Sequence, residues 1–102
     1  MNEILNINGI YCYEEHGVAY LKLDAVAKGL GFVENKNGKQ YIRWRTIRGL
    51  LQEFNFATSC ETEQVNNNTF IPENIFYRLA MKAKNETAEK FQAKVADEII
   101  PF

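Results

Sequence analysis

The backbone of this chain can reverse within two residues at three dipeptides: Asn8-Gly9, His16-Gly17 and Asn37-Gly38. Glycine adopts positive φ at no steric cost, and Asn-Gly between alternating apolar and polar residues is a strong signal for a two-residue β-hairpin. Runs rich in β-forming residues flank the first two dipeptides, at 3–8, 10–14 and 18–23. We therefore predict a three-stranded antiparallel meander at the start of the chain, and a loop or tight hairpin over 33–40.

Helical periodicity dominates the remainder of the chain. The short apolar stretch after Asp24 predicts a first helix, with Asp24 as its N-cap and Gly31 just beyond its C-terminal end. Three further helices are predicted from apolar stripes, over about 43–54, 73–84 and 86–99. The predicted fold class is α+β, a small antiparallel meander or hairpin packed with about four helices.

The connections around the last two helices are also readable. Phe70-Ile71 is expected to be extended, and Pro72 suits the first turn of the helix that follows. Asn85 either ends that helix or caps the next one. The polar segment 57–69 has the least ordered sequence pattern, and we interpret it either as a hairpin or as a plain loop.

The helix at 43–54 has two distinct faces. An apolar face consists of Trp44, Ile47, Leu51 and Phe54. Arg45, Arg48 and Gln52 fall together on the opposite face at 100° per residue. With the helix before it, this arrangement resembles a helix-turn-helix element over 24–54, although the connection exceeds the usual three or four residues.

Size and composition place limits on what the chain does. We expect residues 1–102 to form a single domain, and the apolar ending IIPF suggests the N-terminal fragment of a longer protein. No apolar run approaches the roughly 20 residues of a membrane span, and no secretory signal is present, so a cytosolic protein without a membrane partner is expected. With two cysteines and one histidine, Cys12 is interpreted as a buried structural thiol and His16 as a turn residue, and no metal site is expected.

Enzyme motifs are lacking in the sequence. No phosphate-binding glycine loop is present, and the only serine, Ser59, is not in a nucleophile elbow. The acidic pairs lie in polar surroundings that are typical of solvated surface. We therefore expect no catalysis, no cofactor and no small-molecule substrate.

The positive charge of the chain is concentrated in one stretch. Residues 35–52 hold five of the 12 basic residues and no acidic residue, while the whole chain has a net charge of −1. A helix with a basic outer face is a common way to approach a phosphate backbone. A solvated face, with arginines lying over Trp44 and Tyr41, explains the same pattern equally well.

From this stretch we derive a set of candidate DNA contacts. Arg45, Arg48 and Gln52 would face a groove, and Lys36, Lys39 and Arg43 would hold phosphates. Tyr41 could stack on a base. On this hypothesis Arg45→Ala and Arg48→Ala remove DNA binding with little loss of stability. Secondary phosphate contacts are possible at Arg78, Lys82 and Lys84.

The second half of the chain resembles a known family. The pattern in question is an Ile-Pro-acidic start, a Tyr-Arg-Leu triplet, a lysine-rich joint and a Phe-x-x-x-Val stretch that ends in Ile-Pro. Its residues are Ile71, Pro72, Glu73, Tyr77, Arg78, Leu79, Lys82, Lys84, Phe91, Val95, Glu98, Ile100 and Pro101. The segments LDAVA at 23–27 and LGF at 30–32 match the first half. This order of motifs resembles the Bro-N domain of phage antirepressors and baculovirus Bro proteins, and KNGKQYIRW resembles the version in Firmicutes prophages.

The resemblance implies a prophage antirepressor-type DNA-binding domain that regulates phage gene expression in the bacterial host cytosol. The implied partners are double-stranded DNA, a second copy of the chain and a phage repressor. Since the charge is near neutral, an alternative is a protein-interaction module that binds a repressor or itself without touching DNA.

Overall fold

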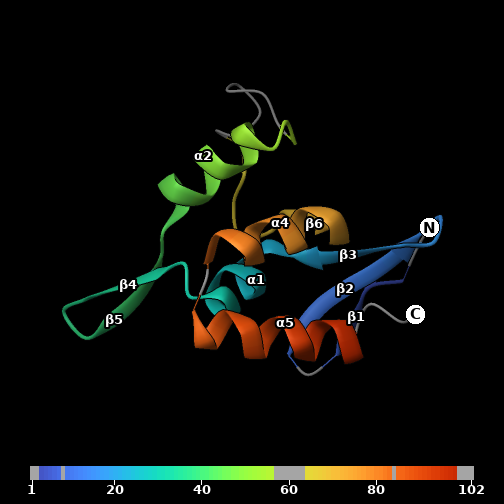
Figure 1. Ribbon diagram of the computed structural model, residues 1–102, viewed down its shortest axis with the longest axis horizontal. Helices are drawn as coiled ribbons and strands as arrows, with labels where there is room; N and C mark the ends of the chain where they lie inside the picture. The colour runs from blue at the N-terminus through green and yellow to red at the C-terminus, as the bar shows by residue number, and fades with distance from the viewer. Residues whose placement is uncertain (1–2, 8, 57–63, 84, 99–102) are drawn as a thin grey trace.

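The computed structural model describes residues 3–7, 9–56, 64–83 and 85–98. Its elements follow in the order β1 Leu5–Ile7, β2 Ile10–Glu15, β3 Val18–Lys22, α1 Leu23–Leu30, β4 Val33–Lys36, β5 Lys39–Ile42, α2 Trp44–Glu53, β6 Phe70–Pro72, α4 Glu73–Ala83 and α5 Glu86–Glu98 (Figure 1). The predicted α+β class, with an antiparallel sheet and four helices in the described part, is confirmed.

The N-terminal meander forms as predicted and gains a fourth strand. Strands β1, β2 and β3 pair antiparallel in sequence order. The second turn has His16 at φ 53° and Gly17 at φ 80°, the left-handed conformations that a two-residue turn requires. Asn8 of the first turn lies outside the described residues. Strand β6 then pairs with β3, with Leu21 opposite Ile71.

Pro72 is the last residue of β6 and not, as predicted, part of the first turn of α4. Strand β6 lies at the edge of the sheet, next to β3 alone. A proline is tolerated at a sheet edge because its missing N–H has no ladder partner to lose there.

One face of the four-stranded sheet forms one side of the hydrophobic core. Cys12, Leu21 and Ile71 lie side by side across three strands and are fully buried. Helices α1 and α4 pack against this sheet and α5 packs against them (Figure 1). The buried thiol of Cys12 confirms its structural role, and burial raises its pKa.

Helix α1 begins at Leu23, so Asp24 is not its N-cap as predicted. Asp24 lies in the first turn, and its Oδ1 accepts a hydrogen bond from the Ala25 N–H at 2.7 Å. Strand β3 continues directly into the helix, and the Leu23 N–H donates to the Thr69 carbonyl at 2.7 Å. A distant carbonyl therefore satisfies one of the four free N–H groups at this helix end, where no N-cap side chain forms a hydrogen bond. Gly31, at φ 85°, ends the helix as predicted.

The side chain of Asn85 links the start of α5 to the end of α1. Its Oδ1 accepts a hydrogen bond from the Ala88 N–H at 2.7 Å and so caps α5, one of the two predicted roles. Its Nδ2 donates to the Leu30 carbonyl at 3.3 Å, at the C-terminal end of α1. One side chain therefore fixes the start of α5 against the end of α1.

Helices α1 and α5 approach closely at Gly29. A methyl group on Gly29 would lie 2.3 Å from the ring of Phe91, far inside van der Waals contact. A methyl group on Gly49, in α2, would meet no atom within 4 Å. The two glycines are therefore a matched pair that separates packing from helix propensity.

We expect Gly29→Ala to destabilise the domain by about 1–3 kcal/mol, because the Phe91 ring must be displaced from the helix interface. Gly49→Ala should instead stabilise it by about 0.5–1 kcal/mol, since alanine is the better helix former in an open position. Urea unfolding of both variants measures the difference. Equal effects of the two substitutions would contradict the close packing of α1 on α5.

Candidate nucleic-acid interface

A β-hairpin connects α1 to α2. Strands β4 and β5 form a separate two-stranded sheet that closes at Lys36 opposite Lys39. Between them Asn37 has φ 53° and Gly38 φ 79°, so the tight hairpin is the correct choice of the two predicted alternatives. The two predicted helices are present, but this hairpin replaces the short turn of a helix-turn-helix element. It extends from the body as an arm (Figure 1).

The two faces of the arm differ in chemistry. By register, Glu34 lies opposite Tyr41 and Lys36 opposite Lys39, and these four side chains share one face. The other face has the amide pair Asn35 and Gln40 near the tip. All six of these residues are exposed.

The base of the arm is fixed by backbone hydrogen bonds. The Arg43 N–H donates to the Phe32 carbonyl at 2.9 Å, and the Phe32 N–H donates to the Ala27 carbonyl at 2.9 Å. Phe32 is buried in the core. The arm is therefore held at its root by α1, while its tip makes no such contact with the described residues.

Positive charge gathers along the arm and the first turn of α2. Lys39, Arg43 and Arg45 are exposed, and none forms an ion pair with a residue that the structure describes. Lys36 is partly neutralised by Glu34 at 3.8 Å. Tyr41 remains 48% exposed beside these cations. Five residues of the predicted set therefore share one region: Lys36, Lys39, Tyr41, Arg43 and Arg45.

Arg48 does not join that region. Helix α2 buries Ile47 and Leu51 completely, as its predicted apolar face requires. Arg48 is half-buried: its Nη2 donates to the Val65 carbonyl at 2.9 Å, and its guanidinium lies 5.9 Å from the centre of the Trp44 ring. The role of Arg48 in this structure is to attach α2 to the chain segment before β6. Gln52, also in the predicted set, is exposed.

The predicted secondary contacts connect α4 to α2. The Arg78 guanidinium lies 5.8 Å from the centre of the Phe54 ring, and Lys82 Nζ pairs with Glu53 at 3.5 Å. Lys84 lies outside the described residues. Both described cations already serve the packing of α2, so they are less suited to hold phosphate than those of the arm.

Other chemistry is not apparent in the described residues. Within the ranges that the structure covers, no group of three His, Cys, Asp or Glu side chains could hold a metal ion. In the same ranges, no helix has the length and apolar character needed to cross a bilayer.

Comparison with known proteins then gives the family. The model for the N-terminal domain of the BRO family matches residues 9–101, nearly the whole chain. This chain belongs to the BRO family. The N-terminal domain of this family is associated with phage antirepressor and DNA-binding proteins. No curated protein and no solved structure matches this BRO domain at a significant level.

The contact of Arg48 with Val65 revises one expectation for this BRO domain. We expect Arg48→Ala to destabilise it by about 1.5–3 kcal/mol, because the Val65 carbonyl loses a charged donor in a partly buried position. Arg45→Ala, one turn earlier and exposed, should change stability by less than about 0.5 kcal/mol. Thermal or urea unfolding of the pair checks this, and equal stability of the two variants would contradict a structural role for Arg48.

Proposed function

We propose that this BRO domain is the DNA-binding domain of a prophage antirepressor-type regulator, which acts on double-stranded DNA in the bacterial host cytosol. The observation that supports this most is the arm, with the exposed cations Lys39, Arg43 and Arg45 gathered along it and at the start of α2. Arg48, Arg78 and Lys82 are left out of the proposed contact set because their side chains already hold α2.

The shape of the arm suits a DNA groove. The major groove of B-DNA is about 12 Å wide and admits a two-stranded β-ribbon as readily as a helix. In the proposed complex the face with Asn35 and Gln40 meets the base edges. Lys36 and Lys39, on the opposite face, reach the phosphates that border the groove, and Arg43 and Arg45 contact the backbone at the root of the arm.

The number of cations limits the affinity. Each phosphate contact contributes about 0.9 to the slope of log K against log salt, so three or four contacts give a modest, salt-sensitive affinity for one domain. Two copies on a two-fold operator would double the contacts. We therefore include a homodimer in the proposed function.

We expect Lys39→Ala/Arg45→Ala to reduce the salt slope of binding to a random duplex by about 2, since two phosphate contacts are removed. The matched control is Lys90→Ala/Lys94→Ala on α5, which removes the same charge from a helix outside the arm and should leave the slope unchanged. Fluorescence anisotropy across a salt series measures both. Equal losses in the two double variants would show that net charge, and not the arm, drives binding.

The amide face of the arm should control sequence preference. A bidentate amide–adenine contact discriminates by about 1–3 kcal/mol. We expect Asn35→Ala/Gln40→Ala to flatten the base preference in a selection from random duplexes, while affinity for non-specific DNA falls by less than about threefold. A selected motif identical to that of the wild type would exclude the arm as the base-reading element.

The alternative is a protein-interaction module that docks on a phage repressor, or on a second copy of itself, and touches no DNA. The observation that favours it is the aromatic, partly exposed face of the main sheet, which a DNA contact through the arm does not use. If wild type and arm variants all fail to bind duplex at low salt, this alternative becomes the leading function.

A further inference from the structure

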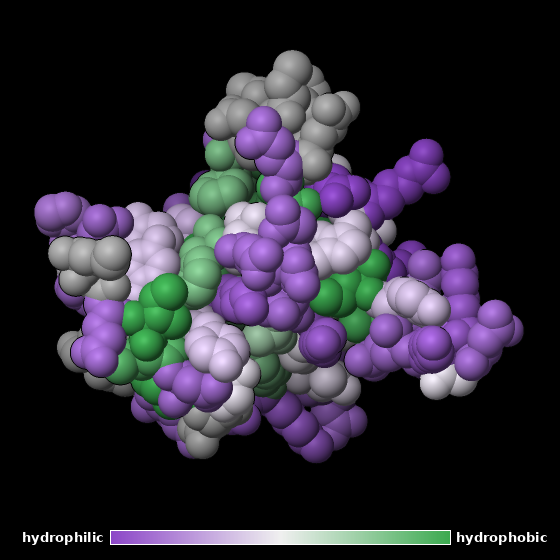
Figure 2. Space-filling view, turned by 180° about the vertical axis from the view of Figure 1, so that it is seen from behind, coloured by the Kyte–Doolittle hydropathy of each residue, from purple (hydrophilic) through white to green (hydrophobic). Residues whose placement is uncertain are grey.

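The face of the main sheet that points away from the helices is aromatic. Along each strand, residues that point away from the helices alternate with buried residues. The strand register places the outward-pointing residues of neighbouring strands side by side. These are Tyr11, Tyr13 and Glu15 of β2, Val18, Tyr20 and Lys22 of β3, and Phe70 and Pro72 of β6. Tyr11 is 45% exposed and the adjacent Ile4 55%. We call this set the outer face; Figure 2 shows apolar and weakly polar side chains gathered on this side of the molecule.

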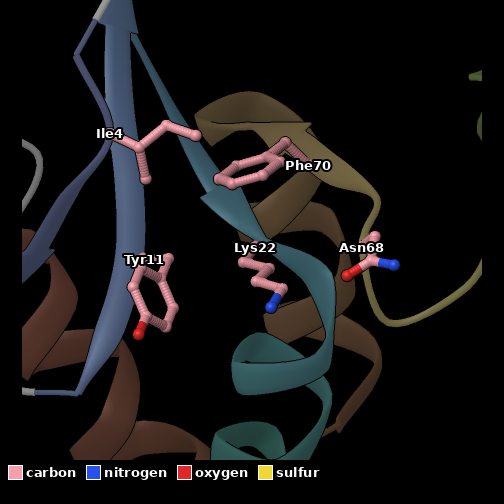
Figure 3. Close-up of a pocket in the computed structure, with 5 residues that line it drawn as sticks. All are labelled: Ile4, Tyr11, Lys22, Asn68 and Phe70. Atoms are coloured by element: carbon pink, nitrogen blue, oxygen red, sulfur yellow. The ribbon is translucent and has the colours of Figure 1, made fainter.

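The rings of the outer face form an ordered surface. Tyr13 and Tyr20 stack with their centroids 4.9 Å apart and their planes 6° apart, and Phe70 lies 5.1 Å from Tyr13. Beside them an open hollow of about 310 Å³ is lined by Ile4, Tyr11, Lys22, Asn68 and Phe70 (Figure 3). A contiguous exposed apolar surface of this kind marks an interaction site more often than plain solvent-facing sheet.

The charges on the outer face do not suit a nucleic acid. Among the described residues of this face Lys22 is the single cation, and its Nζ lies 4.0 Å from Asp24 and 5.1 Å from the centre of the Tyr11 ring. Glu15 occupies the other end of the same face. A strand of bases stacked on the tyrosines would therefore have one cation for its phosphates at one end of the face and a carboxylate at the other. These side chains are better suited to a protein.

The layout of charge on the outer face fits a second copy of this chain as the partner. By register, Glu15 lies at the hairpin end of the outer face, opposite Val18, and Lys22 lies at the far end of the neighbouring strand. The stacked pair Tyr13 and Tyr20 lies between them. A two-fold axis parallel to the sheet and just outside the outer face, crossing the strands at the tyrosine pair, brings Glu15 of each copy to the end of the partner copy's face that holds Lys22.

We propose that the outer face is the interface of a homodimer of this chain, with the Tyr13–Tyr20 pair at its centre and reciprocal Glu15–Lys22 contacts at its two ends. Tyrosine and phenylalanine at the core with charges at the rim is the usual anatomy of a protein interface. The outer face has fewer side chains than the roughly 20–30 residues per side of a standard interface, so the dimer should be weak, with a Kd of about 10–100 μM. This inference does not depend on DNA binding, because the arm takes no part in it.

Sedimentation equilibrium over about 1–500 μM tests the dimer directly. The wild type should show a concentration-dependent rise towards twice the monomer mass. Glu15→Lys alone and Lys22→Glu alone each place like charges together twice and should weaken dimerisation at least about tenfold. The double variant Glu15→Lys/Lys22→Glu restores both pairs with reversed sign, and its Kd should return to within about threefold of the wild type.

The rescue separates the interface from folding defects. Lys22→Glu also faces Asp24 within its own chain, but within one chain Glu15 and Lys22 lie at opposite ends of the outer face, so Glu15→Lys could not repair damage there. The control pair Glu89→Lys and Lys94→Glu makes the same charge changes on α5 and should leave the Kd unchanged. A monomer at all concentrations, or a double variant no better than the worse single one, would overturn the proposal.

Discussion

The pairing of β6 with β3 is the contact on which the arrangement of the two halves of the chain depends. It places Leu21 against Ile71 at the centre of the core and brings residues 64–69 beside the start of α1. In that segment the Thr69 carbonyl accepts a hydrogen bond from the Leu23 N–H, and the Val65 carbonyl accepts one from Arg48 Nη2. One long-range strand pair thus positions both the first helix and the helix that follows the arm.

The sequence allowed the local features to be predicted because their causes are local. Two-residue turns at His16-Gly17 and Asn37-Gly38 follow from residues that accept positive φ, and the apolar face of α2 follows from helical spacing. The partner of β6 could not be predicted, since a three-residue strand contains no information on which edge it joins. The prediction of Asp24 as N-cap was wrong for the same reason. The Leu23 N–H at the start of α1 bonds the Thr69 carbonyl, which is far along the chain.

The sequence predicted which basic residues belong to the candidate site, but not which of their side chains are exposed. The cluster of cations in residues 35–52 is visible in the sequence, and the exposed set on the arm comes from it. A helical wheel groups Arg48 with Arg45, yet only the fold shows that Val65, which is 17 residues away, accepts its hydrogen bond. A charged residue next to an apolar face can belong to either environment, and the distant partner decides which.

Charge distribution decides whether the proposed DNA binding is compatible with a net charge of −1. Residues 35–52 hold five basic residues, and the remainder of the chain has seven against all 13 acidic ones. At physiological salt the Debye length is about 8 Å, so a phosphate at the arm senses mainly the charges around the arm. Helix α5 begins near the root of the arm and runs away from it (Figure 1), so Asp97 and Glu98 lie farther from the arm than Glu86 and Glu89, which are in its first turn. Association would therefore depend on local contact more than on long-range steering, and a second copy that doubles the local cations matters more here than in a strongly basic domain.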